Sequence, residues 1–302
     1  MREIPKRETD KVRKASARLQ KLEAAQARPT ATEVGEVNAQ VIGIGPGVCS
    51  VDVDGVIRHV RCEIPVVAGD EVSVMNDSVS GIAPRRTVLT RTDPNNSNRE
   101  RVIVANVDRM VIVAAITNPP LRTGLIDRYI IAATRAGIKP ILCINKLDLS
   151  DDLSEIERYE IPIARCSTKT GEGIDQLRDS LAGDLTVLTG HSGVGKSSLL
   201  NALIEQEQAR VGSLNDETGK GRHTTTASRL YRLKNGGRII DTPGIREFGL
   251  GPVTLQELKA AFPEFSAENC QFNDCTHKDE PGCAIREAGG PRYEAWLRLL
   301  AL

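Results

Sequence analysis

The residues best suited to chemistry form a glycine-rich run that ends in a lysine and a serine. The run matches G-x-x-x-x-G-K-[ST], between a strand expected at Leu185–Leu188 and a helix expected at Ser197–Ile204. Glycines let backbone N–H groups turn inward around a phosphate, and a helix N-terminus attracts its negative charge. Lys196 would reach the β- and γ-phosphates and act in catalysis, and the Ser197 hydroxyl would bind Mg²⁺. The predicted nucleoside triphosphate site comprises Gly190, His191, Ser192, Gly193, Val194, Gly195, Lys196, Ser197 and Ser198.

A second motif predicts that the bound base is guanine. Asn145, Lys146 and Asp148 follow a strand expected at Pro140–Ile144 and resemble the N-K-x-D loop of GTPases. The Asp148 carboxylate can accept hydrogen bonds from guanine N1 and its exocyclic amine, whereas adenine offers neither donor there. The Lys146 stem can cover one face of the base. Asp148 therefore disfavours an ATP-using enzyme. A later run resembles the S-A-K loop that backs guanine: Ser167, Thr168 and Lys169.

Two loops after the phosphate loop predict contacts to Mg²⁺ and the γ-phosphate. Asp241 follows a strand expected at Arg238–Ile240 and begins a run that resembles D-x-x-G. Asp241 would hold Mg²⁺ through water, and the Gly244 N–H would meet the γ-phosphate. The run 218–226 resembles the threonine-bearing switch I loop of GTPases. We assign the Mg²⁺-binding threonine to Thr225, and the spacing leaves open its neighbours Thr224 and Thr226.

The residue that positions the attacking water is not given by these motifs. Ile245 stands where Ras-like enzymes have a glutamine that orients the water, and it cannot form that hydrogen bond. Another group must do so, or hydrolysis is slow until a partner helps. His223 is the best internal candidate, and its alternative role is a loop residue that contacts RNA or solvent. His191 is a weaker candidate.

Three thiols and one imidazole lie within fourteen residues near the C-terminus. Cys270, Cys275, His277 and Cys283 make a closed tetrahedral zinc site, which is structural because no position stays open for water. A segment of about fifty residues has too small a core to be stable alone, so metal binding should contribute folding free energy. The other cysteines stand singly in expected strands and are predicted to be small core residues: Cys49, Cys62, Cys143 and Cys166.

The pattern near the N-terminus predicts a small β-barrel over residues 36–91. Alternating runs separated by glycine turns predict about five strands, four of them at Ala39–Ile44, Val48–Val53, Val56–Cys62 and Glu71–Val74. Five short strands suit an OB-fold. The barrel contains no aromatic residue, so RNA would be bound through phosphate contacts or guanidinium stacking; the alternative is a spacer barrel. The available side chains are Arg58, His59, Arg61, Arg85, Arg86 and Arg91.

Beyond a polar linker predicted at 92–100, strands and helices alternate, which predicts a parallel sheet covered on both faces. Further strands are expected at Arg109–Ile116 and Ile161–Ala164, and helices at Ile126–Ala136, Leu153–Tyr159 and Ile174–Leu181. The predicted domains are a basic flexible tail (1–35), an OB-fold barrel (36–91), a nucleotide-binding domain (92–252) and a mainly helical zinc-binding module (253–302).

Composition limits the possible classes of protein. The 302 residues are 40% hydrophobic and 26% charged, which excludes a disordered or fibrous chain. Forty basic residues balance forty acidic ones, yet residues 1–30 carry a local excess of five positive charges. That segment is either a solvated tail or an arm that binds a polyanion. Without an apolar leader or an 18-residue apolar run, we expect a cytoplasmic protein with no membrane partner. Nothing indicates oligomerisation, so we expect a monomer.

The order of the loops is circularly permuted. Ordinary GTPases run from the phosphate loop through the two switch loops to the base loop and the backing loop. Here the base loop (145–148) and the backing loop (167–170) come first. Such a permutation is possible because domain termini usually lie close together at the surface. The permuted order, the leading barrel and the Cys/His set resemble the ribosome small-subunit-dependent GTPase A family (RsgA, also called YjeQ) over roughly residues 36–300.

The resemblance implies a fold and a function. The fold is an α/β P-loop GTPase domain, circularly permuted, with an N-terminal all-β OB-fold barrel and a C-terminal zinc-binding, mainly helical module. The function is a GTP hydrolase that binds the 30S ribosomal subunit and its 16S rRNA late in assembly and leaves after hydrolysis. Hydrolysis would be slow alone and stimulated by 30S subunits. The rival hypothesis is an RNA-binding assembly scaffold that uses GTP as a slow regulatory sensor.

Overall fold

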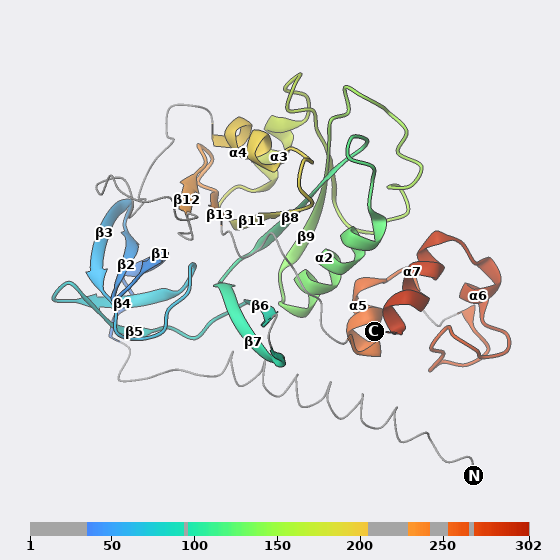
Figure 1. Ribbon diagram of the computed structural model, residues 1–302, viewed down its shortest axis with the longest axis horizontal. Coiled ribbons are helices and arrows are strands. Elements are labelled where there is room, and N and C mark those ends of the chain that lie inside the picture. The colour runs from blue at the N-terminus through green and yellow to red at the C-terminus, as the bar shows by residue number, and fades with distance from the viewer. Residues whose placement is uncertain (1–34, 94–95, 205–228, 242–252, 266–268, 302) are drawn as a thin grey trace, which may run out of the picture.

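The computed structural model describes residues 35–93, 96–204, 229–241, 253–265 and 269–301 (Figure 1). Within these ranges the chain forms a small barrel, a six-stranded sheet with helices on both faces, and a helical C-terminal module. Figure 1 shows the barrel at one end of the molecule and the C-terminal helices at the other. No helix in the described ranges is both long enough and apolar enough to cross a membrane.

The predicted barrel is present, and it is closed. Its strands are β1 (Ala39–Gly45), β2 (Val48–Val53), β3 (Val56–Arg61), β4 (Glu71–Met75) and β5 (Ser78–Ile82), in the order β1-β2-β3-β5-β4. Asp54 and Gly55 have φ of 48° and 94°, the left-handed backbone that a two-residue hairpin requires. Small branched side chains fill the interior. The fifth strand, β5, was not placed from sequence because its serines and glycine give no apolar alternation.

The large sheet carries the predicted base loop, backing loop and phosphate loop at the ends of its strands. Its order is β10 (Ile163–Arg165), β9 (Lys139–Asn145), β8 (Arg109–Ala115), β11 (Leu185–Thr189), β13 (Arg238–Asp241) and β12 (Arg229–Arg232). All neighbours are parallel except β12, which runs antiparallel to β13. The chain moves outward from β8 to β10 and then from β11 to β13, so the order reverses between β8 and β11. Ligands of such sheets bind at the carboxyl ends of the strands near this reversal.

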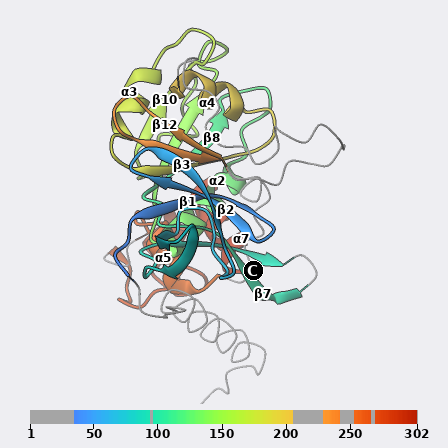
Figure 2. The same cartoon turned by 90° about the vertical axis from the view of Figure 1, so that its left-hand side faces the viewer.

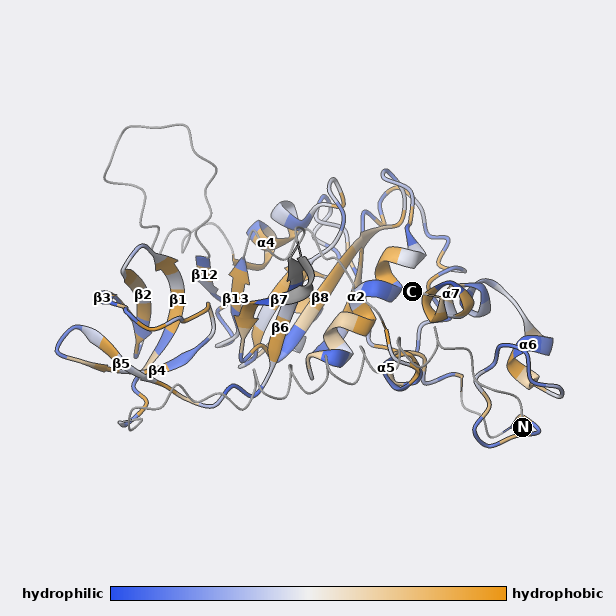
Figure 3. Cartoon of the chain, turned by 60° about the horizontal axis from the view of Figure 1, so that its bottom comes forward, coloured by the Kyte–Doolittle hydropathy of each residue, from blue (hydrophilic) through white to orange (hydrophobic). Residues whose placement is uncertain are grey.

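Helices bury both faces of this sheet. Met110 and Ile112 of β8 pack in one cluster with α2 (Thr123–Arg135). The alternate residues Val111 and Val113 pack with α3 (Ile174–Ser180) and α4 (Lys196–Ile204). Because both faces are covered, the central strand β8 is apolar at every position after Arg109, and Figure 3 colours it orange.

A β-hairpin replaces the predicted polar linker. β6 (Val88–Asp93) pairs with β7 (Asn96–Ala105) in a two-stranded sheet of its own, so the segment predicted as a polar linker at 92–100 is part of a hairpin. Residues 92–100 contain no apolar residue. A ribbon that belongs to neither main sheet needs no apolar face, which is why the sequence pattern did not reveal it. The hairpin is fixed at its base, where Val88, Leu89 and Val104 are buried.

The helix predicted at Leu153–Tyr159 is also absent. These residues form successive turns, in which the N–H of Ile156 bonds to Leu153 O and that of Tyr159 to Ile156 O. Ile156 and Tyr159 are nevertheless buried, so the apolar positions were predicted correctly although the helical backbone was not.

The C-terminal module contains α5 (Leu255–Ala261), α6 (Ala284–Ala288) and α7 (Pro291–Leu300). Thr254 and Glu257 form a capping box at the start of α5. An aromatic cluster lies at the centre, where Phe262 and Trp296 meet edge to face with ring centroids 5.6 Å apart. Phe265 packs against both rings.

Buried ion pairs attach this module to α2. Arg135 of α2 donates to Glu257 at 2.9 Å. Arg292 of α7 pairs with Asp127 of α2 and donates to Glu264 at 2.7 Å, and its guanidinium lies 3.9 Å from the centroid of Phe262. Burial raises the pKa of Asp127 to about 6, against the opposing effect of Arg292. The module is thus held by groups that are costly to separate once buried.

The barrel is attached to the opposite edge of the sheet. Arg232 of β12 pairs with Asp52 of β2, and Arg238 of β13 donates to Gln40 of β1 at 2.7 Å. Figure 2, viewed from the barrel end, shows the barrel strands together with β12. The barrel and the C-terminal module are therefore each bonded directly to strands of the large sheet or to the helix that covers it.

Candidate functional site

The glycine-rich run lies at the reversal point of the sheet, between β11 and α4. Gly190 has φ of 138°, and a Cβ there would lie 2.1 Å from Val113 O of the neighbouring strand. At Gly195, with φ of 95°, a Cβ would lie 2.3 Å from the Asn145 amide nitrogen. Only glycine fits at these two positions. The loop therefore has the close approaches and left-handed backbone expected of a phosphate-binding loop.

Lys196 begins α4 with its ammonium turned back over the loop. Its Nζ donates to Gly190 O at 2.8 Å and to His191 O at 2.7 Å, so the charge is held where the loop would surround a phosphate. Ser192 is exposed, Val194 is buried, and Ser197 and Ser198 are exposed in the first turn of α4. The two serine hydroxyls are accessible to a ligand at the helix N-terminus.

Asn145 joins three of the predicted loops. It ends β9 and is fully buried. Its amide nitrogen donates to Val194 O of the phosphate loop at 3.0 Å, and its amide oxygen accepts from the Thr168 N–H at 3.1 Å. The sequence predicted contact with a nucleotide for Asn145, but this bridging depends on three segments distant in sequence. Asn145 thus fixes the base loop, the backing loop and the phosphate loop relative to one another.

The predicted guanine acceptor is held by the backing loop. The Ser167 hydroxyl donates to Asp148 Oδ1 at 2.7 Å, and Lys169 Nζ lies 3.4 Å from Oδ2. The hydrogen bond from Ser167 and the charge of Lys169 lower the pKa of Asp148. The carboxylate therefore stays ionised and accepts hydrogen bonds, as recognition of the guanine N–H groups requires.

Lys146 extends along the phosphate loop. Its ammonium donates to Gly193 O at 2.9 Å and to Asn118 O in the loop after β8. This geometry stretches the aliphatic stem between the base loop and the phosphate loop. The loop after β8 carries no recognised motif, so the sequence analysis missed Asn118.

Of the residues predicted to contact Mg²⁺ and the γ-phosphate from the two switch loops, only Asp241 lies in the described part of the chain. The register that pairs Ile240 with Val187 puts Asp241 at the level of Leu188, close to the start of the phosphate loop. Asp241 therefore reaches the same edge of the sheet as the phosphate loop. The predicted residues His223, Thr224, Thr225, Thr226 and Gly244, the position Ile245 and the basic tail lie outside the described residues.

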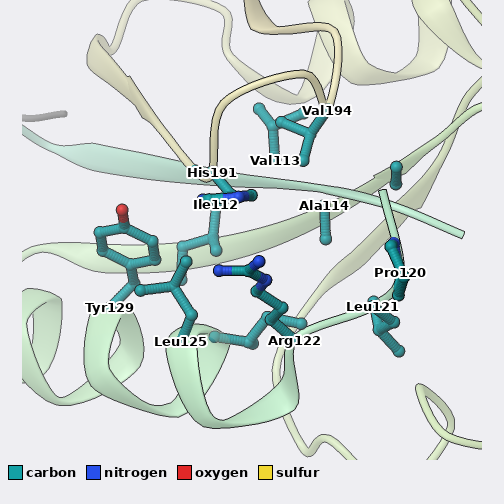
Figure 4. Close-up of a pocket in the computed structure, with 13 residues that line it drawn as sticks. Ile112, Val113, Ala114, Pro120, Leu121, Arg122, Leu125, Tyr129, His191 and Val194 are labelled. Carbon is teal, nitrogen blue, oxygen red and sulfur yellow. The ribbon is translucent and has the colours of Figure 1, made fainter. Parts of the chain in front are cut away.

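His191 lies on the α2 side of the sheet. A small pocket of about 20 Å³ beneath the phosphate loop is lined by His191, Tyr129, Leu125 and Arg122. Figure 4 shows the imidazole next to Ile112, with Arg122 and Tyr129 below it. A volume of this size holds about one water molecule. The ring therefore lies against largely apolar side chains of β8 and α2.

The predicted metal ligands converge in the C-terminal module. The ligand atoms of Cys270, Cys275, His277 and Cys283 all lie within 4.8 Å of one another. All but Cys270 are buried. His277 Nε2 lies 3.0 Å from Phe265 O, and Nδ1 lies 3.5 Å from Cys283 Sγ. An Nε2–H bond to the carbonyl leaves Nδ1 as the metal-binding nitrogen, as is usual for histidine ligands. The donor set fits a tetrahedral metal ion.

Most arginines expected to bind RNA through the barrel already have carboxylate partners. Arg85 makes two hydrogen bonds to buried Asp70, at 2.7 and 2.8 Å. Arg86 donates to Asp108 and Arg58 to Asp77, each at 2.8 Å. The pair Arg85–Asp70 is structural because it is bidentate and largely buried. These partners could not be predicted from local sequence, since the residues of each pair are 15 or more positions apart.

The four other cysteines are not metal ligands in the described structure. Cys49, Cys143 and Cys166 are buried, and Cys62 is half-buried with its thiol donating to Ile64 O at 3.2 Å. Burial raises the pKa of Cys49 to about 12, so its thiol stays protonated. They are small core residues, as expected.

A family model described as RsgA GTPase matches residues 82–251. The small ribosomal subunit biogenesis GTPase RsgA of Pseudomonas aeruginosa is 41% identical over 293 residues, which cover 91% of this chain and 85% of that protein. The protein of the same name from Photorhabdus laumondii is 41% identical over 245 residues, 75% of this chain and 69% of that protein.

Solved structures match the fold as well. The crystal structure of YjeQ from Thermotoga maritima superimposes with a TM-score of 0.68 at 29% identity, covering 87% of this chain and 97% of that one. YloQ, described as a circularly permuted GTPase, gives a TM-score of 0.65 at 22% identity, over 91% and 97% of the two chains. The permuted order of β8–β10 before β11–β13 is thus the order of a known fold. On sequence, fold and loop geometry together, this chain belongs to the RsgA GTPase family.

Proposed function

We propose that the chain hydrolyses GTP while bound to the small (30S) ribosomal subunit, acts late in the assembly of that subunit, and leaves after hydrolysis. The observation that carries the proposal is the ionised Asp148, fixed by Ser167 beside the phosphate loop. The relatives named above are small ribosomal subunit biogenesis GTPases, which supports the choice of partner. Hydrolysis would be slow for the protein alone and stimulated by 30S subunits.

The proposed guanine site consists of the base loop and the backing loop. Asp148 would accept from guanine N1 and the exocyclic amine, and the stem of Lys146 would cover one face of the ring. The backing loop would close the far side of the base through Ser167, Thr168 and Lys169. Asn145 would hold both loops against the phosphate loop.

The proposed phosphate site is the glycine-rich loop, whose backbone N–H groups would surround the β-phosphate. Lys196 would move from its carbonyl partners to the β- and γ-phosphates and offset their charge. Mg²⁺, when bound with GTP, supplies further positive charge against the phosphates. Ser197, Thr225 and Asp241 would hold it, and the Gly244 N–H would contact the γ-phosphate.

We propose that the metal held by Cys270, Cys275, His277 and Cys283 is one structural Zn²⁺ ion. Three sulfurs and one imidazole nitrogen are soft ligands that favour Zn²⁺ over Mg²⁺ or Ca²⁺. Glu280 supports the loop that carries His277. Its carboxylate accepts from the N–H groups of Thr276 and Lys278 at 2.9 and 3.0 Å. Although partial burial opposes the effect, hydrogen bonds from Thr276 and Lys278 lower the pKa of Glu280 to about 2.

The fold offers a route from the nucleotide to the C-terminal module. A short run of residues separates Asp241 from α5, and the ion pairs Arg135–Glu257 and Arg292–Asp127 attach α5 and α7 to α2. Loss of the γ-phosphate would release Gly244 and Thr225. Their movement would pass to the C-terminal module while the barrel and the basic tail contact 16S rRNA.

We further propose the division of the chain into tail (1–35), barrel (36–91), GTPase domain (92–252) and zinc module (253–302). The β6–β7 hairpin would then belong mostly to the GTPase domain. The protein would act as a monomer in the cytoplasm, where ribosomal subunits are assembled.

The second candidate function is an RNA-binding assembly scaffold with GTP as a slow regulatory sensor. Ile245 favours it, because an isoleucine cannot orient a water molecule. Lys196, Ser197, Thr225 and Asp241 together favour an enzyme, since the predicted ligands of Mg²⁺ and the γ-phosphate are all present.

Replacing His223 with alanine tests the assignment of the water-positioning residue. We expect turnover on 30S subunits to fall about a hundredfold or more, because a general base or water-orienting group is lost. GTP affinity should stay near normal, since His223 is not predicted to bind the base or the phosphates. Unchanged single-turnover hydrolysis on the subunit would show that another residue has the role.

Release after hydrolysis predicts that the nucleotide controls binding to the subunit. The protein with a non-hydrolysable GTP analogue should bind purified 30S subunits about tenfold more tightly than the protein with GDP, because a nucleotide shifts the equilibrium only by its differential affinity. Equilibrium binding in each nucleotide measures this. Equal affinity in both states would contradict release driven by hydrolysis.

A further inference from the structure

Three arginines surround a groove outside the nucleotide site. The groove lies between α2 and α7 and has a volume of about 380 Å³. Arg122 precedes α2, Arg128 lies in its second turn, and Arg298 lies near the end of α7. All three are exposed, and among the described residues none forms a hydrogen bond or ion pair with a carboxylate. They contrast with Arg85 and Arg135, whose guanidinium groups are already bound to acids.

The groove contains little that offsets this charge. Its other lining residues are small or apolar, except for Asp127. Asp127 is 1% exposed and is paired with Arg292. The charge of Arg298 also lowers the pKa of the Asp127 carboxyl, against the larger effect of burial. Arg292 in turn is shared with Glu264. The two acids and Arg292 leave one negative charge, which is buried, whereas the three guanidinium groups at the groove are exposed.

We propose that this groove binds the phosphodiester backbone of an RNA strand. This inference rests on the proposed function at the small ribosomal subunit. Guanidinium groups present planar sets of N–H donors that match phosphate oxygens, and they remain charged at every physiological pH. Arg122 and Arg128 are six residues apart, about 9 Å along the helix axis, so they contact different positions along an extended ligand. A strand with successive negative charges suits that spacing better than a single anion.

The remaining lining residues favour backbone contacts over base recognition. Gly124, Leu125, Ala295 and Leu299 offer no aromatic ring on which a base could stack and no side-chain acceptor. Phosphate contacts of this kind position a protein without reading sequence. The groove also lies where α2 and the C-terminal module meet, so a bound strand would contact both parts of the molecule.

Charge reversal at the two arginines farthest from the nucleotide site tests this role in the full-length protein. We compare Arg128→Glu and Arg298→Glu with Lys139→Glu, which makes the same change in charge at the exposed amino end of β9. Binding to purified 30S subunits and to a 16S rRNA transcript is measured over a series of salt concentrations. Each groove variant should bind both about tenfold more weakly, with the slope of log affinity against log salt reduced by about one. Lys139→Glu should match wild type.

The outcomes separate the groove from the proposed function. Wild-type affinity and salt slope in both groove variants would overturn the inference. Weaker binding to subunits with unchanged binding to the transcript would also overturn it, because the partner would then be an acidic protein surface. If wild type binds no 30S subunits, the proposed function fails, and the transcript series still tests the groove. Arg298→Gln, measured with thermal unfolding and intrinsic GTP hydrolysis, guards against loss of fold, since both should match wild type.

Discussion

Asp148→Asn is expected to lower GTP affinity by about 10² to 10⁴-fold. The change removes one of the two hydrogen bonds from guanine to a charged acceptor, worth about 1.5–3 kcal/mol, and weakens the other by removing the charge. Every 1.4 kcal/mol is a factor of ten. It also turns an amide N–H toward the exocyclic amine of guanine, so two donors meet. Ser167 would still donate to the remaining oxygen, as it does to Asp148 Oδ1 at 2.7 Å, so the loop should keep its conformation.

A nucleotide with a different base shows whether the loss of GTP affinity is specific to guanine recognition. Xanthine has a carbonyl oxygen in place of the exocyclic amine, and that oxygen can accept from the new amide. Xanthosine triphosphate should therefore bind the variant more tightly than GTP does, in a titration that uses both nucleotides. Asp152→Asn is the matched control, since Asp152 bonds only to its own loop at Ser154. GTP affinity equal to wild type in Asp148→Asn would show that the base lies elsewhere.

Removal of the metal is expected to unfold the C-terminal module. Zinc binding at such sites supplies about 10–16 kcal/mol in small peptides, more than the net stability of a typical domain. The reporter is Trp296, the single tryptophan of the chain, which packs 5.4 Å from His277 and donates to Thr276 O at 3.0 Å. A strong chelator, or Cys283→Ala, should shift Trp296 emission to that of a solvated indole and lower the unfolding temperature.

The control for this experiment is another cysteine of the same chain. Cys62→Ala removes a half-buried thiol in the barrel, far from the metal ligands, and should leave the emission of Trp296 unchanged. Metal content is measured by elemental analysis before and after chelation. An unchanged emission spectrum and unfolding temperature in metal-free protein would show that the aromatic cluster of Phe262, Phe265 and Trp296 holds the module without the ion.

The sequence was sufficient where the chemistry is local. The phosphate loop could be read directly because its glycines are needed for backbone reasons, such as the approach of Gly190 to Val113 O. Five of the six strands of the large sheet were placed within about two residues, since strands buried on both faces are continuously apolar. The antiparallel edge strand β12, with an arginine at each end, was not predicted. The Cys/His set was recognised because metal ligands at short spacing need no long-range information. These features agree with the family assignment.

The sequence was insufficient where a residue's role depends on a distant partner. Arg85 was predicted to contact RNA and instead binds Asp70. Arg292 and Asp127 are 165 residues apart, and no local pattern predicts their pairing. The bridge made by Asn145 between two other loops is of the same kind. The β6–β7 hairpin was not predicted for another reason, because its outer part, residues 92–100, contains no apolar residue.

Hydrolysis of GTP and of ATP, each with and without purified 30S subunits, tests the central claim most directly. We expect slow hydrolysis of GTP alone, strong stimulation by 30S subunits, and little hydrolysis of ATP in either case. Lys196→Ala, which removes the charge held over the phosphate loop, should abolish the stimulated rate. Equal hydrolysis of ATP and GTP would contradict guanine recognition by Asp148. A GTP hydrolysis rate that 30S subunits leave unchanged would contradict the proposal that the subunit activates this enzyme.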